Sequence, residues 1–414
     1  MVQHMTKLWT RNFSILTIGS LISALGSSAA GVGFGILIFK QTGSPLSLAL
    51  YMVANIIPRV ITGFIAGPFV DRHSRKKMIY SLDFISTFIF ISISMILFTG
   101  YFNVLVFTAI AAFLGIMDTI YQLAFMSMFP EVIEKGQHSK AYSLSSLIWP
   151  VSAAVMAPIA AFMIENFDQG VAILMLFNGF TFFIAALLET TIRLKEKLNT
   201  KEIKGFQFVE DLKEGFRYYK MEKGIFGIAI LFACFSFVYT SHDLLRMPYF
   251  IQSETYSLQH FSFLITASSV GRMIGGVVHY IFKYPPKKRY VIAVSVYITV
   301  EFFSATLLYM PYVVMIVVSF LVGLLSVTSY NIRMTATQLY IPTEMRGRIN
   351  STQNLLWNIG AILGALIVGY TAEYSSLDYR LIMLLVAIVS MSAIFLIPIR
   401  MKPEFEKIYN SEAI

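Results

Sequence analysis

Charge is scarce in this sequence. Only 13% of its 414 residues are Asp, Glu, Lys or Arg, about half the share of an ordinary soluble domain. Hydrophobic residues make up 57%, and the mean hydropathy is +0.69. A soluble chain of this length needs more polar surface. The composition therefore excludes a cytosolic enzyme, a nucleic-acid-binding module and a disordered protein, and it indicates that most of the chain lies in lipid.

Cysteine is scarce, and the common catalytic motifs are missing. The single Cys234 lies in an apolar run, which excludes an intrachain disulfide and a cysteine metal site. No Gly-x4-Gly-Lys-Ser/Thr loop is present, so ATP is not the direct energy source. No HExxH motif is present, and the six histidines are scattered. We therefore expect no metal and no cofactor, and a membrane-embedded enzyme is the weaker alternative.

Long apolar runs take the place of these features. A membrane-spanning helix needs about 20 apolar residues, and runs of this kind, rather than the short alternating strands of a barrel, recur through the chain. The sequence predicts an all-α integral membrane protein of twelve transmembrane helices, at about 12–39, 46–70, 79–99, 104–128, 144–164, 171–191, 224–250, 258–282, 290–309, 312–338, 350–373 and 379–399. The first run is too long for a signal peptide, so we interpret it as an uncleaved span.

Positive charge is distributed unevenly between alternate connections. Of the 32 Lys and Arg, 26 fall on one set of connections, and the other set holds only Lys40 and Arg380. The excess of Lys and Arg marks the cytoplasmic side, so we expect both termini in the cytoplasm of what we take to be a bacterial cell, with the protein in its plasma membrane. The net charge of +9 comes from these loops and does not indicate nucleic acid.

The central connection divides the chain into three parts. We expect a six-helix bundle over 1–191, a cytoplasmic linker over 192–223, and a second six-helix bundle with a short tail over 224–414. Within the linker, apolar residues recur at spacings of three and four, which predicts an amphipathic helix at the membrane surface: Phe206, Val209, Leu212, Phe216 and Tyr219. A faint repeat at an offset of 212 relates Arg75–Lys77 to Lys287–Arg289, Gly63 to Gly275 and Pro130 to Pro342. Two such repeats around a midplane site are a transporter architecture.

The most specific motif runs from Gly67 to Lys77 and reads Gly-Pro-Phe-Val-Asp-Arg-His-Ser-Arg-Lys-Lys. Gly63 and Gly67 allow helices to approach closely, and Asp71 suits a neighbouring helix N-terminus. We expect Arg75 to pair with Glu131 at the end of the fourth helix. Such contacts would latch the two halves in one state. The alternative is that Arg72, Arg75 and the two lysines only fix topology and bind anionic lipid.

This motif resembles the signature between helices two and three of the major facilitator superfamily, with His73 where a Gly is usual. Pro130-Glu131, the stretch Pro342–Arg348 and Thr42-Gly43-Ser44 resemble the macrolide-efflux-like branch of that superfamily. The resemblance implies two six-helix bundles, secondary transport by alternating access, and the latch formed by Gly67, Asp71, Arg72, Arg75 and Glu131. The glycines typical of helix five in drug–proton antiporters are absent, because Ala153, Ala157-Pro158 and Ala161 stand there.

Ionisable residues inside spans are candidates for function. They are Arg59, Asp83, Asp118, Asp243, Arg246, Arg272, Glu301 and Arg333. Asp118 lies deep in the fourth span, and we expect it to carry a coupling proton or to contact substrate. Arg59 is the candidate counter-charge, which would make Asp118 structural if it held the carboxylate ionised. The first case is favoured because alternating access requires a site that can lose its charge.

The other embedded charges have simpler expected roles. Asp83 lies near the basic loop and is expected to pair with it. Asp243 and Arg246 are three residues apart, which predicts a mutual ion pair with a structural or gating role, and the adjoining His242 titrates near neutral pH when unperturbed. We expect Arg272 to pair with Glu301, and Arg333 to extend toward the membrane surface. Aromatic residues that could line an apolar cavity are Tyr121, Phe125, Trp149, Phe235, Tyr239 and Trp357.

Together these patterns predict a secondary active transporter that exports a small amphipathic molecule or drug by proton exchange. The expected partners are a small-molecule substrate, protons and membrane lipids, and the expected state is a monomer. The alternatives are uptake, transport of a lipid such as a lysophospholipid, or a receptor on the same fold that does not transport.

Overall fold

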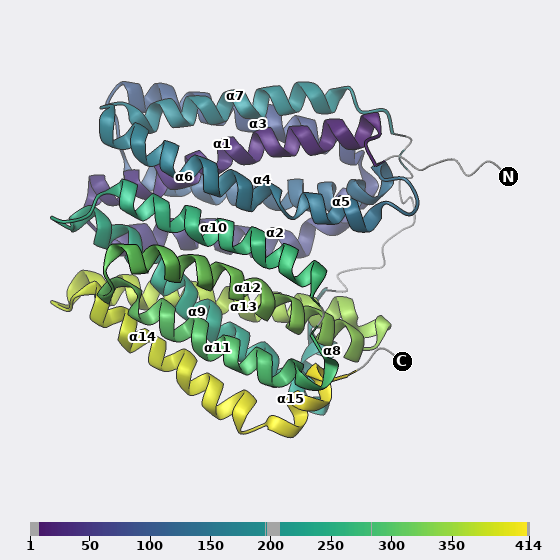
Figure 1. The fold of residues 1–414 in the computed structure, drawn as a ribbon. Helices are drawn as coiled ribbons and strands as arrows, with labels where there is room; N and C mark the ends of the chain where they lie inside the picture. The colour runs from purple at the N-terminus through teal and green to yellow at the C-terminus, as the bar shows by residue number, and fades with distance from the viewer. Residues whose placement is uncertain (1–7, 195, 197–207, 283, 412–414) are drawn as a thin grey trace. The chain divides into compact units, whose positions relative to one another are not determined.

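The chain folds into helices of membrane-spanning length. The computed structural model describes residues 8–194, 196, 208–282 and 284–411, and within these ranges it contains no β-strand. Twelve of its helical segments are long and apolar enough to cross a membrane, which confirms the predicted all-α architecture (Figure 1). The elements before the linker are α1 (Arg11–Thr42), α2 (Pro45–Arg72), α3 (Arg75–Phe98), α4 (Val104–Met128), α5 (His138–Ser145), α6 (Ile148–Asn166) and α7 (Gly170–Thr190).

The later elements are α8 (Phe208–Met221), α9 (Lys223–Gln252), α10 (Leu258–Ile281), α11 (Arg289–Thr306), α12 (Tyr312–Tyr340), α13 (Arg346–Tyr374), α14 (Tyr379–Ile394) and α15 (Lys402–Tyr409). Contacts between α-carbons group the chain into a first unit, Met1–Gly43 with Ala54–Ile203, and a second unit, Ser44–Val53 with Lys204–Ile414. The boundary falls inside α2, whose first turns group with the second unit.

Polar side chains fix several helix ends. Thr10 accepts a hydrogen bond from Phe13 N at the start of α1, and Asn103 accepts from Leu105 N and Val106 N at the start of α4. Both satisfy backbone donors that a helix start leaves unpaired. Gly43 ends α1 with φ of 63°, a conformation that favours glycine. His73 needs no such freedom, because no described residue other than glycine has a positive φ.

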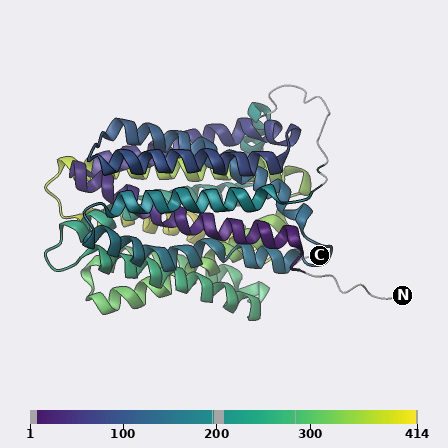
Figure 2. The ribbon, with the colours of Figure 1, turned by 90° about the horizontal axis from the view of Figure 1, so that it is seen from above.

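In the first unit α7 packs against both α1 and α3 and runs alongside them (Figures 1 and 2). Gly179 of α7 allows close contact with α3, since a methyl group there would come within 2.9 Å of the Ile91 side chain. The fifth predicted span is two helices, α5 and α6. They are separated by a turn at Ser146–Leu147, and Pro150 lies in the first turn of α6, where proline is tolerated.

Glycines also set the tightest contacts of the second unit. Helices α10 and α12 meet at Gly271 and Gly323, where an added methyl group would overlap Phe320 O and Ser268 O respectively. The core of this unit includes Tyr219 of α8 and Phe405, Ile408 and Tyr409 of α15. The C-terminal helix is therefore part of the fold rather than a loose tail.

The predicted amphipathic helix is present as α8, but its environment differs from the expectation. It packs on α9 and α13, Tyr219 is fully buried among residues of the second unit, and Glu214 forms an ion pair with Arg348. The apolar face of α8 thus packs partly against protein and not only against the membrane surface, although Phe216 stays exposed. Phe206 lies outside the described residues.

Candidate transport site

Arg59 and Asp118 form an ion pair in the first unit. Arg59 lies near the middle of α2 and Asp118 near the middle of α4, and Arg59 Nη2 is 3.2 Å from Asp118 Oδ2. Their side chains are 48% and 40% exposed. The structure therefore brings together the two residues that the sequence suggested as a pair, and it leaves the pair accessible rather than sealed in the bundle.

Close contact between α2 and α4 holds this pair in place. Asn55 Nδ2 donates to Ala111 O at 3.0 Å, and Thr119 Oγ1 lies 3.3 Å from Arg59 O. A methyl group on Gly115 would overlap Asn55 O and come within 3.1 Å of Arg59 Cγ. The small residue at 115 thus lets the stem of Arg59 lie against α4, one turn from Asp118.

The second predicted pair joins Arg75, the first residue of α3, to Glu131 in the turn after α4. Arg75 Nη1 donates to Glu131 Oε1 at 2.5 Å, with the Arg75 side chain 11% exposed and the Glu131 side chain 34% exposed. Both residues belong to the first unit, so the pair ties the start of α3 to the turn after α4. It does not itself join two units, and its role in a latch stays a prediction.

Other parts of the predicted latch lie differently from the expectation. A methyl group on Gly67 would meet nothing within 4 Å, and one on Gly63 would make only an ordinary contact with Thr119. The close helix approach therefore occurs at Gly115 and not at these glycines. Among the described residues, Asp71 has no hydrogen bond or ion pair, and the Arg72 side chain is exposed.

Embedded charges of opposite sign in the second unit lie farther from one another than Arg59 and Asp118 do, and within the described residues none of them forms an ion pair at salt-bridge distance. Asp243 lies exposed on α9, within electrostatic range of Arg246 and Arg272. Arg246 is half-buried, and its Nε has no hydrogen-bond partner within the described chain. Its electrostatic partners include Asp243 and Glu301. The expected pairing of Arg272 with Glu301 is wrong, because the charged partner of buried Glu301 is Arg246.

Three further expectations need correction. Arg333 does not extend to the surface, since its guanidinium lies 4.1 Å from the centre of the Phe232 ring in a cation–π contact. Phe235 packs in the core of the second unit rather than on a cavity wall. His242 is fully buried, with its Nε2 3.1 Å from Met383 O. By contrast Trp149, Tyr239 and Trp357 are exposed.

A pair of buried acids escaped the sequence analysis. Asp83 of α3 and Glu189 of α7 are 1% and 0% exposed, and their carboxyl groups are in hydrogen-bonding contact with each other. Tyr121 OH of α4 lies 3.5 Å from Glu189 Oε1. The expected partner of Asp83 in the basic loop is therefore wrong. Glu189 was missed because it stands at the very end of a predicted span, where an acid is unremarkable.

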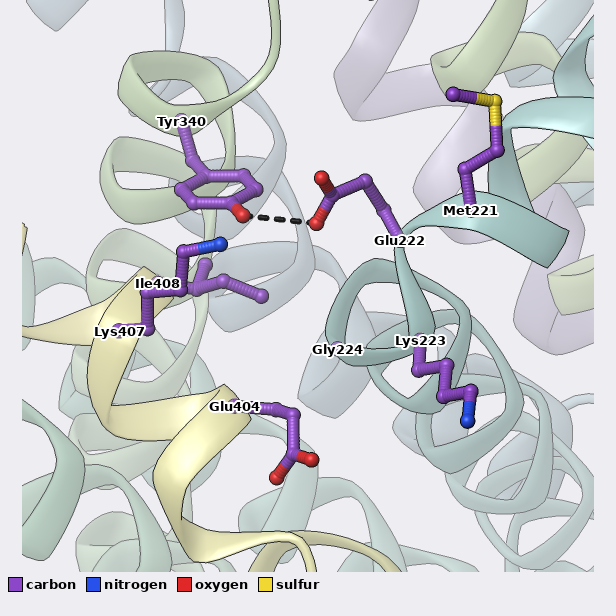
Figure 3. A pocket seen from close by; sticks show the side chains of 8 residues that line it. All are labelled: Met221, Glu222, Lys223, Gly224, Tyr340, Glu404, Lys407 and Ile408. Atoms are coloured by element: carbon purple, nitrogen blue, oxygen red, sulfur yellow. Dashed lines mark hydrogen bonds between the residues drawn. The ribbon is translucent and has the colours of Figure 1, made fainter.

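An open pocket of about 240 Å³ lies in the second unit where α8, α9, α12 and α15 meet. Tyr340 OH donates to Glu222 Oε2 at 2.8 Å, and Lys407 Nζ lies 5.2 Å from the centre of the Tyr340 ring (Figure 3). The contact with the Tyr340 hydroxyl raises the pKa of the Lys407 amine. The contacts of Glu222 and Lys407 with Tyr340 link α15 to α12 and to the start of α9, which suits this region to holding α15 in place.

The described ranges contain no group of three His, Cys, Asp or Glu that could hold a metal ion. The arrangement is instead one of long apolar helices with a few paired charges at their centres. The sequence profile of the Major Facilitator Superfamily matches residues 16–365. The chain belongs to the major facilitator superfamily. It is therefore a membrane transporter and not an enzyme.

Individual transport proteins are similar to this chain along most of its length. Macrolide efflux protein A of Streptococcus pyogenes is 23% identical over 372 residues, covering 86% of this chain and 89% of the relative. The uncharacterized MFS-type transporter YkuC of Bacillus subtilis is 22% identical over 299 residues, covering 70% and 68%.

Two solved structures share the fold. The nucleoside transporter NupG superposes with a TM-score of 0.70 at 13% identity, covering 95% of this chain and all of the other. An inward-facing bacterial homologue of the iron transporter ferroportin gives 0.66 at 17% identity, covering 97% and 99%. At these identities the structures show the fold of major facilitator proteins and leave the substrate open.

Proposed function

We propose that this transporter exports a small amphipathic molecule in exchange for protons by alternating access. The observation that carries the proposal is the Arg59–Asp118 pair. Both charges stand near the centres of apolar helices, yet both are almost half exposed. Charges at that depth are costly against lipid and face polar space instead. The pair therefore marks a surface of the first unit along which a polar or cationic group passes.

An accessible ion pair can open at little cost. Exposed pairs are worth about 0–1 kcal/mol, so a cationic substrate group that approaches Asp118 competes with Arg59 on nearly equal terms. The exposed rings of Tyr239 and Trp357 in the second unit offer apolar contact to an amphipathic compound. Asp118 and Arg59 are accordingly the proposed substrate contacts, with Asp243 and Arg246 as the charged group of the second unit.

Similarity to macrolide efflux proteins over most of the chain supports export. The skewed distribution of Lys and Arg supports the orientation, with both termini on the cytoplasmic side of a bacterial plasma membrane. Glu131, Arg75 and the basic turn around Asp71 and Arg72 then lie on that side. There the Arg75–Glu131 pair is placed to hold the cytoplasmic end of the first unit in one state.

Transport into everted membrane vesicles tests the direction. Vesicles from cells that overproduce the protein are energised and given a radiolabelled macrolide, and separate samples receive ethidium or a labelled lysophospholipid. Export predicts accumulation in everted vesicles that a protonophore abolishes. Accumulation only in right-side-out vesicles would make the protein an importer. Binding without accumulation in either orientation would favour a receptor. Vesicles with Asp118→Asn provide the matched control for background uptake.

A further inference from the structure

The Asp83–Glu189 pair is an unusual group for an apolar bundle. Asp83 lies two turns into α3, and Glu189 lies in the last turn of α7. Each keeps one buried oxygen, Oδ2 of Asp83 and Oε2 of Glu189, for which the described residues supply no donor. Buried polar atoms without partners are costly, so the arrangement requires a donor that the described side chains do not provide.

A shared proton meets that requirement. Two carboxylates in contact repel each other and do not both ionise, whereas one proton between them forms an O–H···O⁻ hydrogen bond that satisfies both groups. Charge-assisted hydrogen bonds of this type are short and strong. Uptake of one proton from water makes this bond, and its release to water leaves two carboxylates that must be separated or hydrated.

The described residues around the pair supply no positive charge that would stabilise two carboxylates. Within the described chain, the electrostatic partners of the two acids are each other and Tyr121. Helix α1, which packs against α7, contributes Gly19, and a methyl group there would lie 3.4 Å from Glu189 Oε1. In the first turn of α3, the side chain of Arg75 is paired with Glu131, and the backbone N–H of Lys76 donates to Glu196.

Tyr121 connects the pair to a partly exposed part of the first unit. Its hydroxyl is next to Glu189, while its side chain is only half-buried and its ring stacks on Phe125. We propose that Asp83 and Glu189 are the proton-binding site of this transporter, sharing one proton and exchanging it with water that reaches them past Tyr121. The proposal rests on the proton coupling proposed above, and it separates the proton site from the Arg59–Asp118 pair that meets substrate.

Infrared spectroscopy detects the shared proton without any substrate. The purified full-length protein in lipid nanodiscs is titrated with pH, and the carbonyl band of protonated carboxyl groups is compared between wild type and Asp83→Asn/Glu189→Gln. The matched control is Glu254→Gln, which removes an exposed acid in the loop before α10. We expect wild type and Glu254→Gln to share a band component that disappears reversibly at alkaline pH, and the double variant to lack it. If the wild-type component persists at alkaline pH while the protein stays folded, the pair is only a structural contact and the proposal is overturned.

Transport then distinguishes failure of this site from failure of proton coupling. Proteoliposomes are assayed with a labelled macrolide in two modes, accumulation driven by a pH gradient and exchange without a gradient. We expect Asp83→Asn and Glu189→Gln to lose accumulation and to retain exchange, because an amide holds the hydrogen bond but carries no transferable proton. Gradient-driven accumulation in both variants at the wild-type level would overturn the site. Absence of gradient-driven accumulation in wild type would overturn the proposed coupling instead, and the infrared result would still report on the pair.

Discussion

The guanidinium of Arg59 lies 3.2 Å from the carboxylate of Asp118, although each residue stands near the middle of a long apolar helix. Because both side chains are almost half exposed, we expect Asp118→Asn to change the free energy of unfolding by no more than about 1 kcal/mol. Transport should fall by roughly tenfold or more, since a charged contact worth about 1.5–3 kcal/mol is removed. Thermal unfolding and vesicle transport measure the two effects separately.

The double variant Arg59→Gln/Asp118→Asn provides the control for an unpaired Arg59. If Asp118 contacts substrate, the double variant regains any lost stability while transport stays low. Recovery of transport in the double variant would show instead that Asp118 serves only to neutralise Arg59.

The Arg75–Glu131 pair predicts a larger structural effect. Arg75 is mostly covered and holds the start of α3 to the turn after α4. We expect Arg75→Ala to destabilise the protein by about 1–2 kcal/mol and to slow transport. Lys77→Ala is the matched control, because it removes an exposed charge of the same sign from the same helical turn. Equal effects of the two substitutions would reduce this loop to a topology signal, and the exchange Arg75→Glu/Glu131→Arg should restore part of the loss.

Asp378 predicts a dependence of stability on pH. Hydrogen bonds from Arg380 Nε and Nη2 hold the pKa of the Asp378 carboxyl below its usual value. The stabilisation is therefore present above the unfolded-state pKa and is lost as pH falls through the lower folded-state pKa. Asp378→Asn keeps a helix-capping oxygen but removes the charge, so at neutral pH we expect it to cost at most about 1 kcal/mol at this exposed position.

Unfolding of the purified protein at neutral and at strongly acidic pH checks this sign. The difference between wild type and Asp378→Asn should vanish in acid. A difference that grows as the pH falls would contradict the assigned cause.

The orientation of the chain is tested by cysteine labelling. In a Cys234→Ala background, Lys213→Cys places a thiol on the exposed side of α8, and Tyr101→Cys places one in the connection between α3 and α4. With both termini cytoplasmic, an impermeant maleimide added to intact cells should label position 101 and leave position 213 unmodified until the cells are opened. The reverse pattern would invert the assignment.

Much of this architecture could be predicted from the apolar runs of the sequence and from the charges within and beside them. Twelve spans follow from length and hydropathy. The partners of Arg59 and Arg75 could be chosen because each had a carboxylate at a matching depth, Asp118 within the fourth span and Glu131 just after its end. These inferences need only the order of helices along the chain. They do not require knowledge of which helix faces meet.

Relations that depend on helix faces were not visible in the sequence. Asp83 was assigned to the basic loop because that loop is near in sequence, whereas packing of α3 on α7 brings it to Glu189. The same limit applied to α8, whose apolar stripe fits either lipid or protein. In the tail, Phe405, Ile408 and Tyr409 recur at helical spacing, a signal that could have predicted α15.

Burial of α15 also predicts a clear effect of substitution. Tyr409 is fully buried, and its hydroxyl lies 2.8 Å from Tyr297 OH. We expect Tyr409→Ala to destabilise the protein by about 3–5 kcal/mol through the cavity it leaves. Tyr409→Phe should cost about 1–3 kcal/mol, because the Tyr297 hydroxyl loses its partner. Chemical unfolding followed by tryptophan fluorescence compares them, and equal stability of both variants with wild type would show that α15 detaches readily.

The place of α15 in the core has a consequence for biosynthesis. Gly224 at the start of α9 packs against Glu404 and Ile408 of α15. The first complete span of the second unit therefore packs against residues that the ribosome adds after every span of that unit. While the ribosome is still adding those residues, the apolar ends of α9, α11 and α12 are in the membrane without α15 packed against them. The second unit can therefore complete its folding only after residue 409 has been made, and nascent chains paused before that point should be more exposed to membrane proteases than released ones.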